Sequence, residues 1–339
     1  MSRPDQPAAP RRRPRTRRDR TDPQPVPDAE FTSYYGRPVV KESPWEIDIP
    51  IYIFAGGVAA GSSLLAAGGQ LSGRPALRRA GRLTAAAGLS VSLVALIHDL
   101  GRPARFLNMM RVVRLTSPMS VGTWLLSLYG APAGVAALDE IVRLTPLPAT
   151  AGPVRLMRAV GRPAGVLAAL TAPPVAAYTA VLLADTATPS WHEAYRELPF
   201  VFTASAAAAS GGLAMVVVPI AQAGPARRLA IGGAVVELLA EQLMERSMGI
   251  TAEPLHEGTG GRYMRAAKVL TAVGAAGAVV SGRRRWAAVL SGAALLAGSF
   301  CTRMAVFEAG QASARDPKYT VVPQRERLAR GEPVRYRQA

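Results

Sequence analysis

Long apolar runs recur along the chain, and short polar or charged stretches separate them. Crossing the roughly 30 Å of hydrocarbon in a bilayer takes about 20 helical residues. The span must be helical because lipid cannot form hydrogen bonds with the backbone, so the backbone groups have to pair with one another. Ala, Gly, Leu and Val occupy all sides of most runs, whereas helices of a soluble bundle would keep a polar face. The pattern predicts an all-α integral membrane protein with eight transmembrane helices, at 50–71, 82–97, 119–138, 165–184, 200–222, 229–243, 267–280 and 286–304.

The chain has a net charge of +17, and two dense clusters of Arg lie in its two ends. Residues 11–20 alone hold seven Arg, in a Pro-rich context with too few apolar residues to fold by itself. We therefore expect a disordered basic arm at 1–48, an eight-helix membrane domain at 49–310 and a basic tail at 311–339. Such an arm would bind anionic membrane lipid. We do not expect a nucleic-acid partner, because the sequence shows no surface that combines aromatic and basic residues.

The location follows from the spans, but the orientation does not. The first span can direct insertion into the plasma (inner) membrane, since the Arg-rich start has no apolar signal sequence after it. With eight spans, both termini share one side, and the loops on the opposite side are short and rich in Arg. The positive-inside rule would make those loops cytoplasmic. Translocating seven clustered Arg is unfavourable, however, so both orientations stay open.

Few residues of this chain could hold a metal or a prosthetic group. Cys301 is the only cysteine, which excludes an iron–sulfur cluster or a cysteine zinc site within the chain. Of the three histidines, only His98 lies at the end of a predicted span, so a haem held by two histidines is not expected. We expect no haem, no iron–sulfur cluster and no metal in this chain.

The passage HDLGRPARFLNMMRVVRLTSPMSVGTW, residues 98–124, lies between two apolar runs. Its first two residues, His98 and Asp99, sit at the end of a predicted span, where ionisable groups are typical of a working site. The alternative is an interfacial anchor whose Arg side chains extend into the headgroup region.

Three carboxylates follow one another at helical spacing in the sixth run. Glu237, Glu241 and Glu245 are four residues apart and share one helix face, which does not face lipid, because a charge at mid-bilayer costs roughly 2.5 to 3.5 kcal/mol. We consider Glu237 and Glu241 candidates for a proton pathway. Two alternatives stay open: an amphipathic helix at the membrane interface, or a structural pair with Arg303.

Four segments together resemble the NrfD / polysulfide reductase membrane-subunit family over about residues 34–320. They are PIYIFAGGVAAGSSLLAAG at 50–68, the passage 98–124, YTAVLL at 178–183 and LPFVFTASAAAASGG at 198–212. DLGRP followed by SPMSVGTW is the most specific of these features. The segment VFEAGQASARDPKYTVVPQR near the end also resembles actinobacterial members.

The resemblance implies two four-helix bundles and a quinone site without protein-bound redox cofactors. It also implies two partners, a ferredoxin-like subunit with 4Fe-4S clusters and, attached to it, a molybdopterin catalytic subunit. Electrons would pass between the clusters and a quinone, either menaquinone or ubiquinone. In the family, the ring pocket lies between the first and fourth helices near the face that docks the iron–sulfur subunit.

On this sequence the pocket maps to Tyr52 and Tyr178. Tyr52 stands where the best-described polysulfide reductases have His, which keeps a hydrogen-bond donor but removes a base that titrates near neutrality. We therefore expect His98 and Asp99 to exchange protons with the bound quinone. Arg102, with Arg105 and Arg111, would orient Asp99 or meet acidic residues of a partner. Trp124, which ends the passage, completes the set expected to bind quinone.

Two other functions stay open at this point. A secondary transporter would also show eight spans and buried carboxylates, although no internal repeat is evident in the sequence. A purely structural anchor would need only docking loops. Sequence does not name the substrate of the catalytic partner.

Overall fold

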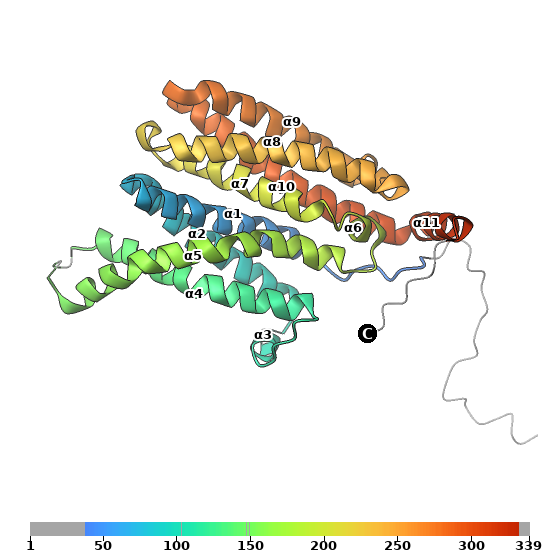
Figure 1. The fold of residues 1–339 in the computed structure, drawn as a ribbon, viewed down its shortest axis with the longest axis horizontal. Helices are drawn as coiled ribbons and strands as arrows, with labels where there is room; N and C mark the ends of the chain where they lie inside the picture. Colours follow the sequence, from blue (N-terminus) through green and yellow to red (C-terminus); the bar gives the residue numbers. More distant parts are fainter. Residues whose placement is uncertain (1–37, 103, 147, 149, 332–339) are drawn as a thin grey trace, which may run out of the picture. The chain divides into compact units, whose positions relative to one another are not determined.

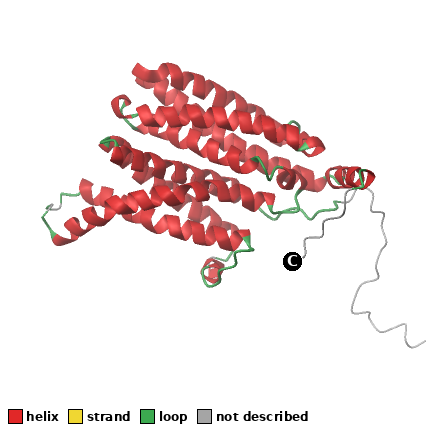
Figure 2. Cartoon of the chain, in the orientation of Figure 1, coloured by secondary structure: helices red, strands yellow, loops and turns green. Residues whose placement is uncertain are grey.

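The computed structural model describes residues 38–102, 104–146, 148 and 150–331, so most of the predicted basic arm and the last eight residues lie outside it. Within the described residues every regular element is a helix, as Figures 1 and 2 show. The long helices are α1 (Asp48–Leu71), α2 (Pro75–Asp99), α4 (Pro118–Leu144), α5 (Gly152–Ala184), α7 (Leu198–Val217), α8 (Gly224–Ser247), α9 (Gly258–Val280) and α10 (Arg285–Arg315). The shorter helices are α3 (Ala104–Met109), α6 (Pro189–Glu193), α11 (Lys318–Ala329) and the 3₁₀ helices η2 (Ile220–Gln222), η3 (Gly249–Leu255) and η4 (Ser281–Arg283).

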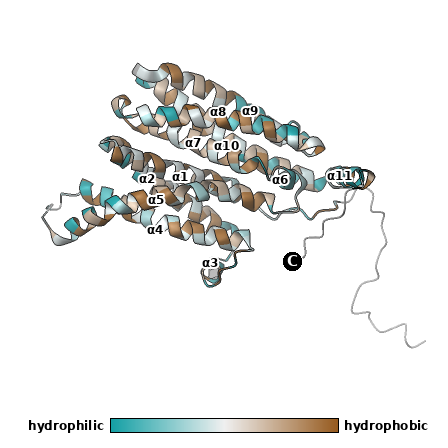
Figure 3. Ribbon diagram, viewed as in Figure 1, coloured by the Kyte–Doolittle hydropathy of each residue, from teal (hydrophilic) through white to brown (hydrophobic). Residues whose placement is uncertain are grey.

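Seven of the described helices are long and apolar enough to cross a membrane: α1, α2, α4, α5, α7, α9 and α10. The integral membrane, all-α prediction is confirmed. The helix α8 has 24 residues, enough to span, but Glu237, Glu241 and Glu245 lower its mean hydropathy. Figure 3 shows more hydrophilic colour on it than on neighbouring α7. The count of eight spans and the two-bundle arrangement stay predictions.

The helix ends follow local sequence. Pro occupies one of the first two positions of α2, α4, α5, α7 and α8, where its missing N–H costs no hydrogen bond. Gly73 turns the chain between α1 and α2 with a φ of 65°, which favours glycine. The helix α7 ends at Val217, before the predicted boundary of 222, because Pro219 cannot continue it.

The long helices alternate in direction, which defines two ends of the assembly. We call face A the end at which α1, α4, α7 and α9 begin, and face B the opposite end. The passage between α2 and α4, the short helix α6 and the helix η3 lie at face A. The connections at face B are short and carry Arg, for example Arg74 and Arg284.

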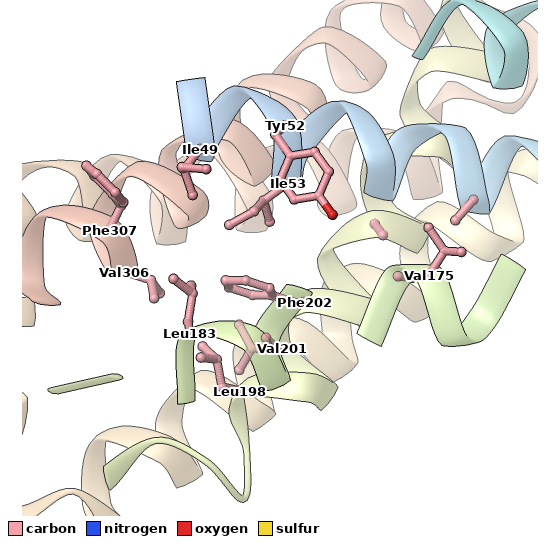
Figure 4. Packing of buried hydrophobic residues seen from close by; sticks show 14 of the residues in the cluster. Ile49, Tyr52, Ile53, Val175, Leu183, Leu198, Val201, Phe202, Val306 and Phe307 are labelled. Carbon is pink, nitrogen blue, oxygen red and sulfur yellow. The ribbon is translucent and has the colours of Figure 1, made fainter. Parts of the chain in front are cut away.

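The contacts between long helices fall into two sets. The N-terminal helix group comprises α1, α2, α4 and α5, and the C-terminal helix group comprises α7, α8, α9 and α10. The two groups meet where α1 contacts α7 and α10 and where α5 contacts α7. Figure 4 shows this junction: Tyr52 and Ile53 of α1 face Phe202 of α7, with Val306 and Phe307 of α10 nearby.

A repeat relates the first helix pair of each group. A Cβ on Gly81 would lie 2.7 Å from the carbonyl oxygen of Ser62, and a Cβ on Gly211 would lie 2.7 Å from the backbone nitrogen of Ala230. Gly211 and Ala230 lie 149 residues after Ser62 and Gly81 (211 − 62 and 230 − 81). Each close approach of two backbones thus recurs at the same spacing.

The same spacing relates the two helices that meet at the junction. A Cβ on Gly57 of α1 would lie 3.1 Å from the Cβ of Ala206 of α7, and Gly61 faces Ser210. Both contacts join a residue to its own counterpart 149 positions later (206 − 57 and 210 − 61), as expected across a two-fold axis between α1 and α7. The expectation that the chain has no internal repeat is therefore wrong for these helix pairs, since small residues hide it in sequence.

Candidate functional site

Tyr52 and Tyr178 meet between α1 and α5, near face A. Tyr52 is 3% exposed, and its side chain forms a hydrogen bond with that of Tyr178. The carbonyl oxygen of Tyr52 also accepts a hydrogen bond from Ser92 of α2, at 3.1 Å. The structure thus brings together the two tyrosines that the sequence assigns to one pocket.

The backbone of α4 lies directly against the ring of Tyr178. A Cβ on Gly122 would lie 1.8 Å from Cζ of Tyr178 and 2.0 Å from its hydroxyl oxygen. Any other residue at 122 would therefore displace the phenol ring. Gly122 is the glycine of SPMSVGTW, so part of that motif's specificity has a steric cause.

An open groove lies along α4 and α5 and has Tyr178 in its lining. Its volume is about 400 Å³. Apolar side chains line most of it, with Tyr178 and Asp185 among the few polar groups. Its lining residues are Leu115, Thr116, Pro118, Val121, Leu125, Pro174, Ala177, Tyr178, Val181 and Asp185. A mainly apolar groove with a single phenol in its lining suits a flat, apolar molecule that carries a carbonyl.

His98 and Asp99 lie at face A, but their contacts differ from those expected. The His98 side chain is 79% exposed, and its Nδ1 lies 2.8 Å from Oδ2 of Asp48. Asp48 begins α1 one helical turn before Tyr52. Asp99 interacts electrostatically with Asp48, Glu46 and His98. The direct partner of His98 is therefore Asp48, a residue that the sequence did not single out.

The other passage residues with predicted roles, Arg102, Arg105 and Trp124, have exposed side chains. Arg102 is exposed, and Arg105 donates a hydrogen bond to the carbonyl oxygen of Leu100. Trp124 is 38% exposed and donates to the carbonyl oxygen of Val112 at 3.4 Å. These contacts hold the passage together, and none of them reaches the tyrosine pair. Quinone-binding roles for Arg102 and Trp124 stay predictions.

A buried ion-pair network joins four helices of the N-terminal helix group near face B. Arg82 of α2 lies 2.7 Å from Asp139 and 3.2 Å from Glu140, both on α4. It also donates to the side-chain oxygen of Gln70 on α1 and to the backbone oxygen of Gly161 on α5. Additional ion pairs join Arg78 to Glu140 and Arg143 to Asp139. This network fixes the helices relative to one another at the end opposite to the tyrosines.

Sequence reasoning missed this network because the predicted spans end at it. Asp139 follows directly after the predicted span 119–138, and Arg82 starts the span 82–97, so neither residue was singled out as a buried charge. The available signal was the spacing of Arg78 and Arg82 and of Asp139 and Arg143, each pair four residues apart on one helix face.

Glu237 and Glu241 lie in the C-terminal helix group, away from the tyrosines. They are 0% and 1% exposed, and Thr302 of α10 contacts both carboxyl groups. Arg303 interacts electrostatically with both, yet no ion pair within 4.0 Å joins them in the described part of the chain. Burial rules out an interfacial helix that presents these two carboxylates to water.

No group of three or more His, Cys, Asp or Glu side chains in the described ranges is arranged to hold a metal ion. The chemistry that the described residues offer at face A is therefore hydrogen bonding by two phenols and proton exchange by an imidazole and carboxylates.

Comparison with protein-family models gives a match over more than half of the chain. A family model described as "Polysulphide reductase, NrfD" matches residues 39–244, which is 206 (244 − 39 + 1) of the 339 residues. The matched part runs from just before α1 to the end of α8 and includes the tyrosine pair, Gly122 and His98. No curated protein matches the chain.

Proposed function

The chain belongs to the NrfD polysulphide reductase family of membrane subunits of respiratory oxidoreductase complexes, and we propose that it passes electrons between an iron–sulfur subunit and the quinone pool. A menaquinone or ubiquinone headgroup would enter the groove along α4 and α5 from the lipid. The observation that carries the proposal is the contact between buried Tyr52 and half-buried Tyr178, because Tyr178 also lines that groove.

The pair offers one hydrogen bond to a ligand. Two phenols carry two hydroxyl protons, and one of these is used in the bond between Tyr52 and Tyr178. Because Tyr178 lines the groove and Tyr52 is buried, Tyr52 would donate to Tyr178, and Tyr178 would donate to a quinone carbonyl. Gly122 keeps the phenol of Tyr178 in the position that this requires.

Proton exchange needs a further group, since oxidation of a quinol releases two protons together with two electrons. A phenol with an ordinary pKa near 10 does not titrate near neutrality. Asp48 lies one turn from Tyr52, and exposed His98 bonds to Asp48 at 2.8 Å. We assign proton exchange with the water at face A to His98 and Asp48, with Asp99 as a neighbouring charge rather than the direct partner.

Face A also supports docking of the partner. The passage between α2 and α4 exposes cationic and apolar side chains side by side, a combination typical of interfaces that carry charge complementarity around apolar contacts. The exposed side chains are Arg102, Arg105, Leu107, Arg111, Val112, Val113, Arg114 and Leu115. Members of the family associate with iron–sulfur subunits. We propose that the iron–sulfur subunit binds this passage with acidic residues, and that a molybdopterin subunit attaches to it.

The test is quinone turnover by the assembled complex with single hydroxyl deletions. Tyr178→Phe and Tyr52→Phe should each lower turnover about tenfold, the loss of one hydrogen bond in a dry site, without loss of assembly. Tyr129→Phe is the matched control. Tyr129 is also buried, and its hydroxyl bonds to Ser63 at 2.9 Å within the same helix group. Full turnover by the double variant Tyr52→Phe/Tyr178→Phe would instead support a purely structural anchor.

A further inference from the structure

The polar cluster in the C-terminal helix group contains more acceptors than its donors can serve. Oγ1 of Thr302 lies 2.9 Å from Oε1 of Glu237 and 3.4 Å from Oε1 of Glu241. The carbonyl oxygen of Gly298 is 3.2 Å from the same hydroxyl. A hydroxyl has one proton, so it cannot donate to all three oxygens. Ser205, which also contacts Glu237, donates its hydroxyl proton to Ser299 at 2.8 Å. A proton carried by one carboxyl and donated to Thr302 would satisfy the remaining contact.

The charges of the cluster also indicate one bound proton. Arg303 is its cation, and it donates a hydrogen bond to the carbonyl oxygen of Phe202 at 2.8 Å. Both Oε2 atoms of Glu237 and Glu241 are buried without a hydrogen-bond partner, as are Nε and Nη1 of Arg303. Two ionised carboxylates and one guanidinium would leave a net negative charge in a buried apolar environment. One bound proton makes the cluster neutral.

We infer that Glu237 and Glu241 form a proton-binding site that holds one proton between them and exchanges it only with face A. Glu237, which interacts directly with the charge of Arg303, is the ionised member. Glu241 is the protonated member, because it lies between the carboxylates of Glu237 and Glu245 on α8. Its cationic neighbour, Lys268 of α9, is paired with Glu245 at 2.6 Å. Thr302 then donates to Glu237 and accepts from Glu241, in keeping with its shorter distance to Glu237.

The path to face A runs through Glu245, one turn beyond Glu241 on α8. Its side chain is 14% exposed, and its Oε1 lies 2.6 Å from Nζ of Lys268 on α9. Exposed His256 approaches Glu245 to 3.9 Å. Toward face B the same helix face continues with small apolar residues, Gly233, Ala230 and Ala226. Within the described residues, the polar row on α8 therefore stops at Glu237.

Arg303 connects this site with the N-terminal helix group. Its Nη2 would lie 3.6 Å from a Cβ on Gly57, which is five residues after Tyr52 on α1. The guanidinium also lies over the ring of Phe202, 4.1 Å from the centroid, and Phe202 faces Tyr52 in Figure 4. Positive charge that develops near the tyrosines would repel Arg303 and favour release of the shared proton. This link rests on the proposed function, whereas the proton site itself does not.

Infrared difference spectroscopy of the full-length chain in lipid nanodiscs tests the site without quinone. At neutral pH the protein should show the C=O band of a buried, protonated carboxyl that shifts on exchange into D₂O. Glu241→Gln should abolish this band and, being of similar shape, should leave the fold intact. Glu245→Gln is the control: it should retain the band and slow its D₂O shift at least severalfold.

Two results would overturn the inference. One is the absence of a protonated carboxyl band in the wild-type protein at neutral pH, and the other is a band that survives in Glu241→Gln. If the band is present but quinone turnover does not depend on Tyr52 and Tyr178, the proton site stands and the proposed function fails. For the link to α1, oxidation of added quinol by the assembled complex, with the electrons passing to its iron–sulfur subunit, should change the band in the wild-type protein and in Arg303→Lys, but not in Arg303→Gln. An identical change in Arg303→Gln would show that Arg303 is not the link.

Discussion

Arg82 and Arg303 are both 2% exposed, one in each helix group, yet their surroundings differ. Arg82 bonds to two carboxylates, to Gln70 and to two backbone oxygens, including that of Gly161, and only its Nε has no hydrogen-bond partner. Arg303 makes one direct hydrogen bond, to Phe202, and leaves two of its nitrogens, Nε and Nη1, without partners. A buried cation that is largely satisfied by carboxylates holds its surroundings in one arrangement, whereas a largely unsatisfied one can respond to a change in nearby charge.

The two helix groups also differ in where their buried polar groups lie. The helix pairs α1–α2 and α7–α8 have related backbones, but the N-terminal helix group places its ion pairs near face B and its tyrosines near face A. The C-terminal helix group has its carboxylates beside Thr302 instead. We interpret the first as a rigid frame for quinone chemistry and the second as a proton-binding site.

The largest expected effect is on stability, when the buried Arg of each helix group is replaced by Gln. Arg82→Gln leaves Asp139 and Glu140 buried without their main counter-charge, so the free energy of unfolding should fall by about 3–5 kcal/mol. Arg303→Gln removes a cation with one direct partner and should cost about 1–3 kcal/mol. Denaturant titration of both variants in the same detergent measures the difference. Equal losses would contradict the distinction between a satisfied and an unsatisfied cation.

The steric role of Gly122 predicts the next largest effect. Gly122→Ala forces the ring of Tyr178 away from α4, so quinone turnover should fall about tenfold or more. The matched control is Gly134→Ala on the same helix, where a Cβ meets no atom within 4 Å. Since Ala favours helix over Gly, neither change should weaken α4 itself. Comparable turnover in the two variants would exclude Tyr178 from the site.

A smaller effect should distinguish Asp48 from Asp99. His98→Ala and Asp48→Asn should each lower quinone turnover severalfold and leave complex assembly intact, because both break the 2.8 Å contact. Asp99→Asn should change turnover less, since Asp99 is not the direct partner of His98. Loss of assembly in His98→Ala would favour an anchoring role for this end of the passage.

The smallest effect concerns the contact between the helices α11 and η3 at face A. Lys318 of α11 lies 2.8 Å from Glu253 of η3, and its hydrogen bond holds the pKa of the Glu253 carboxyl below its ordinary value. The contact should stabilise α11 fully above the unfolded-state pKa and lose that effect as the pH falls through the lower folded-state pKa. Hydrogen exchange of α11 should therefore accelerate in acid. Lys318→Ala should remove this pH dependence, and unchanged dependence would exclude the pair as its cause.

The sequence predicted the helical membrane class well because long apolar runs have few other solutions. It also paired Tyr52 with Tyr178, through the resemblance to a known family. It could not find Asp48 as the partner of His98, because the two lie 50 positions apart in sequence and meet only when α1 packs on α2. The role of Gly122 was hidden for the same reason, since a glycine in a membrane helix does not reveal which side chain it accommodates.

The buried polar groups were the hardest to place. Charged residues at the ends of apolar runs usually lie at the membrane interface. Arg82 and Asp139 instead lie within helices that extend beyond the apolar runs, and both side chains are buried between helices. The stripe of Glu237 and Glu241 was visible from spacing, but its burial and its contact with Thr302 required the packing of α8 against its neighbours. The predicted roles of Arg102 and Trp124 fall on residues that lie at the surface of the passage.

The most direct test of the account is the position of the quinone itself. A photoreactive quinone analogue, activated on the complex in native lipid, should label peptides of α4 and α5 that line the groove beside Tyr178, and excess native quinone should prevent this labelling. Gly122→Ala should reduce the labelling, and Gly134→Ala should not. Labelling confined to α7–α10, beside Glu237, would contradict the assignment of quinone chemistry to the N-terminal helix group.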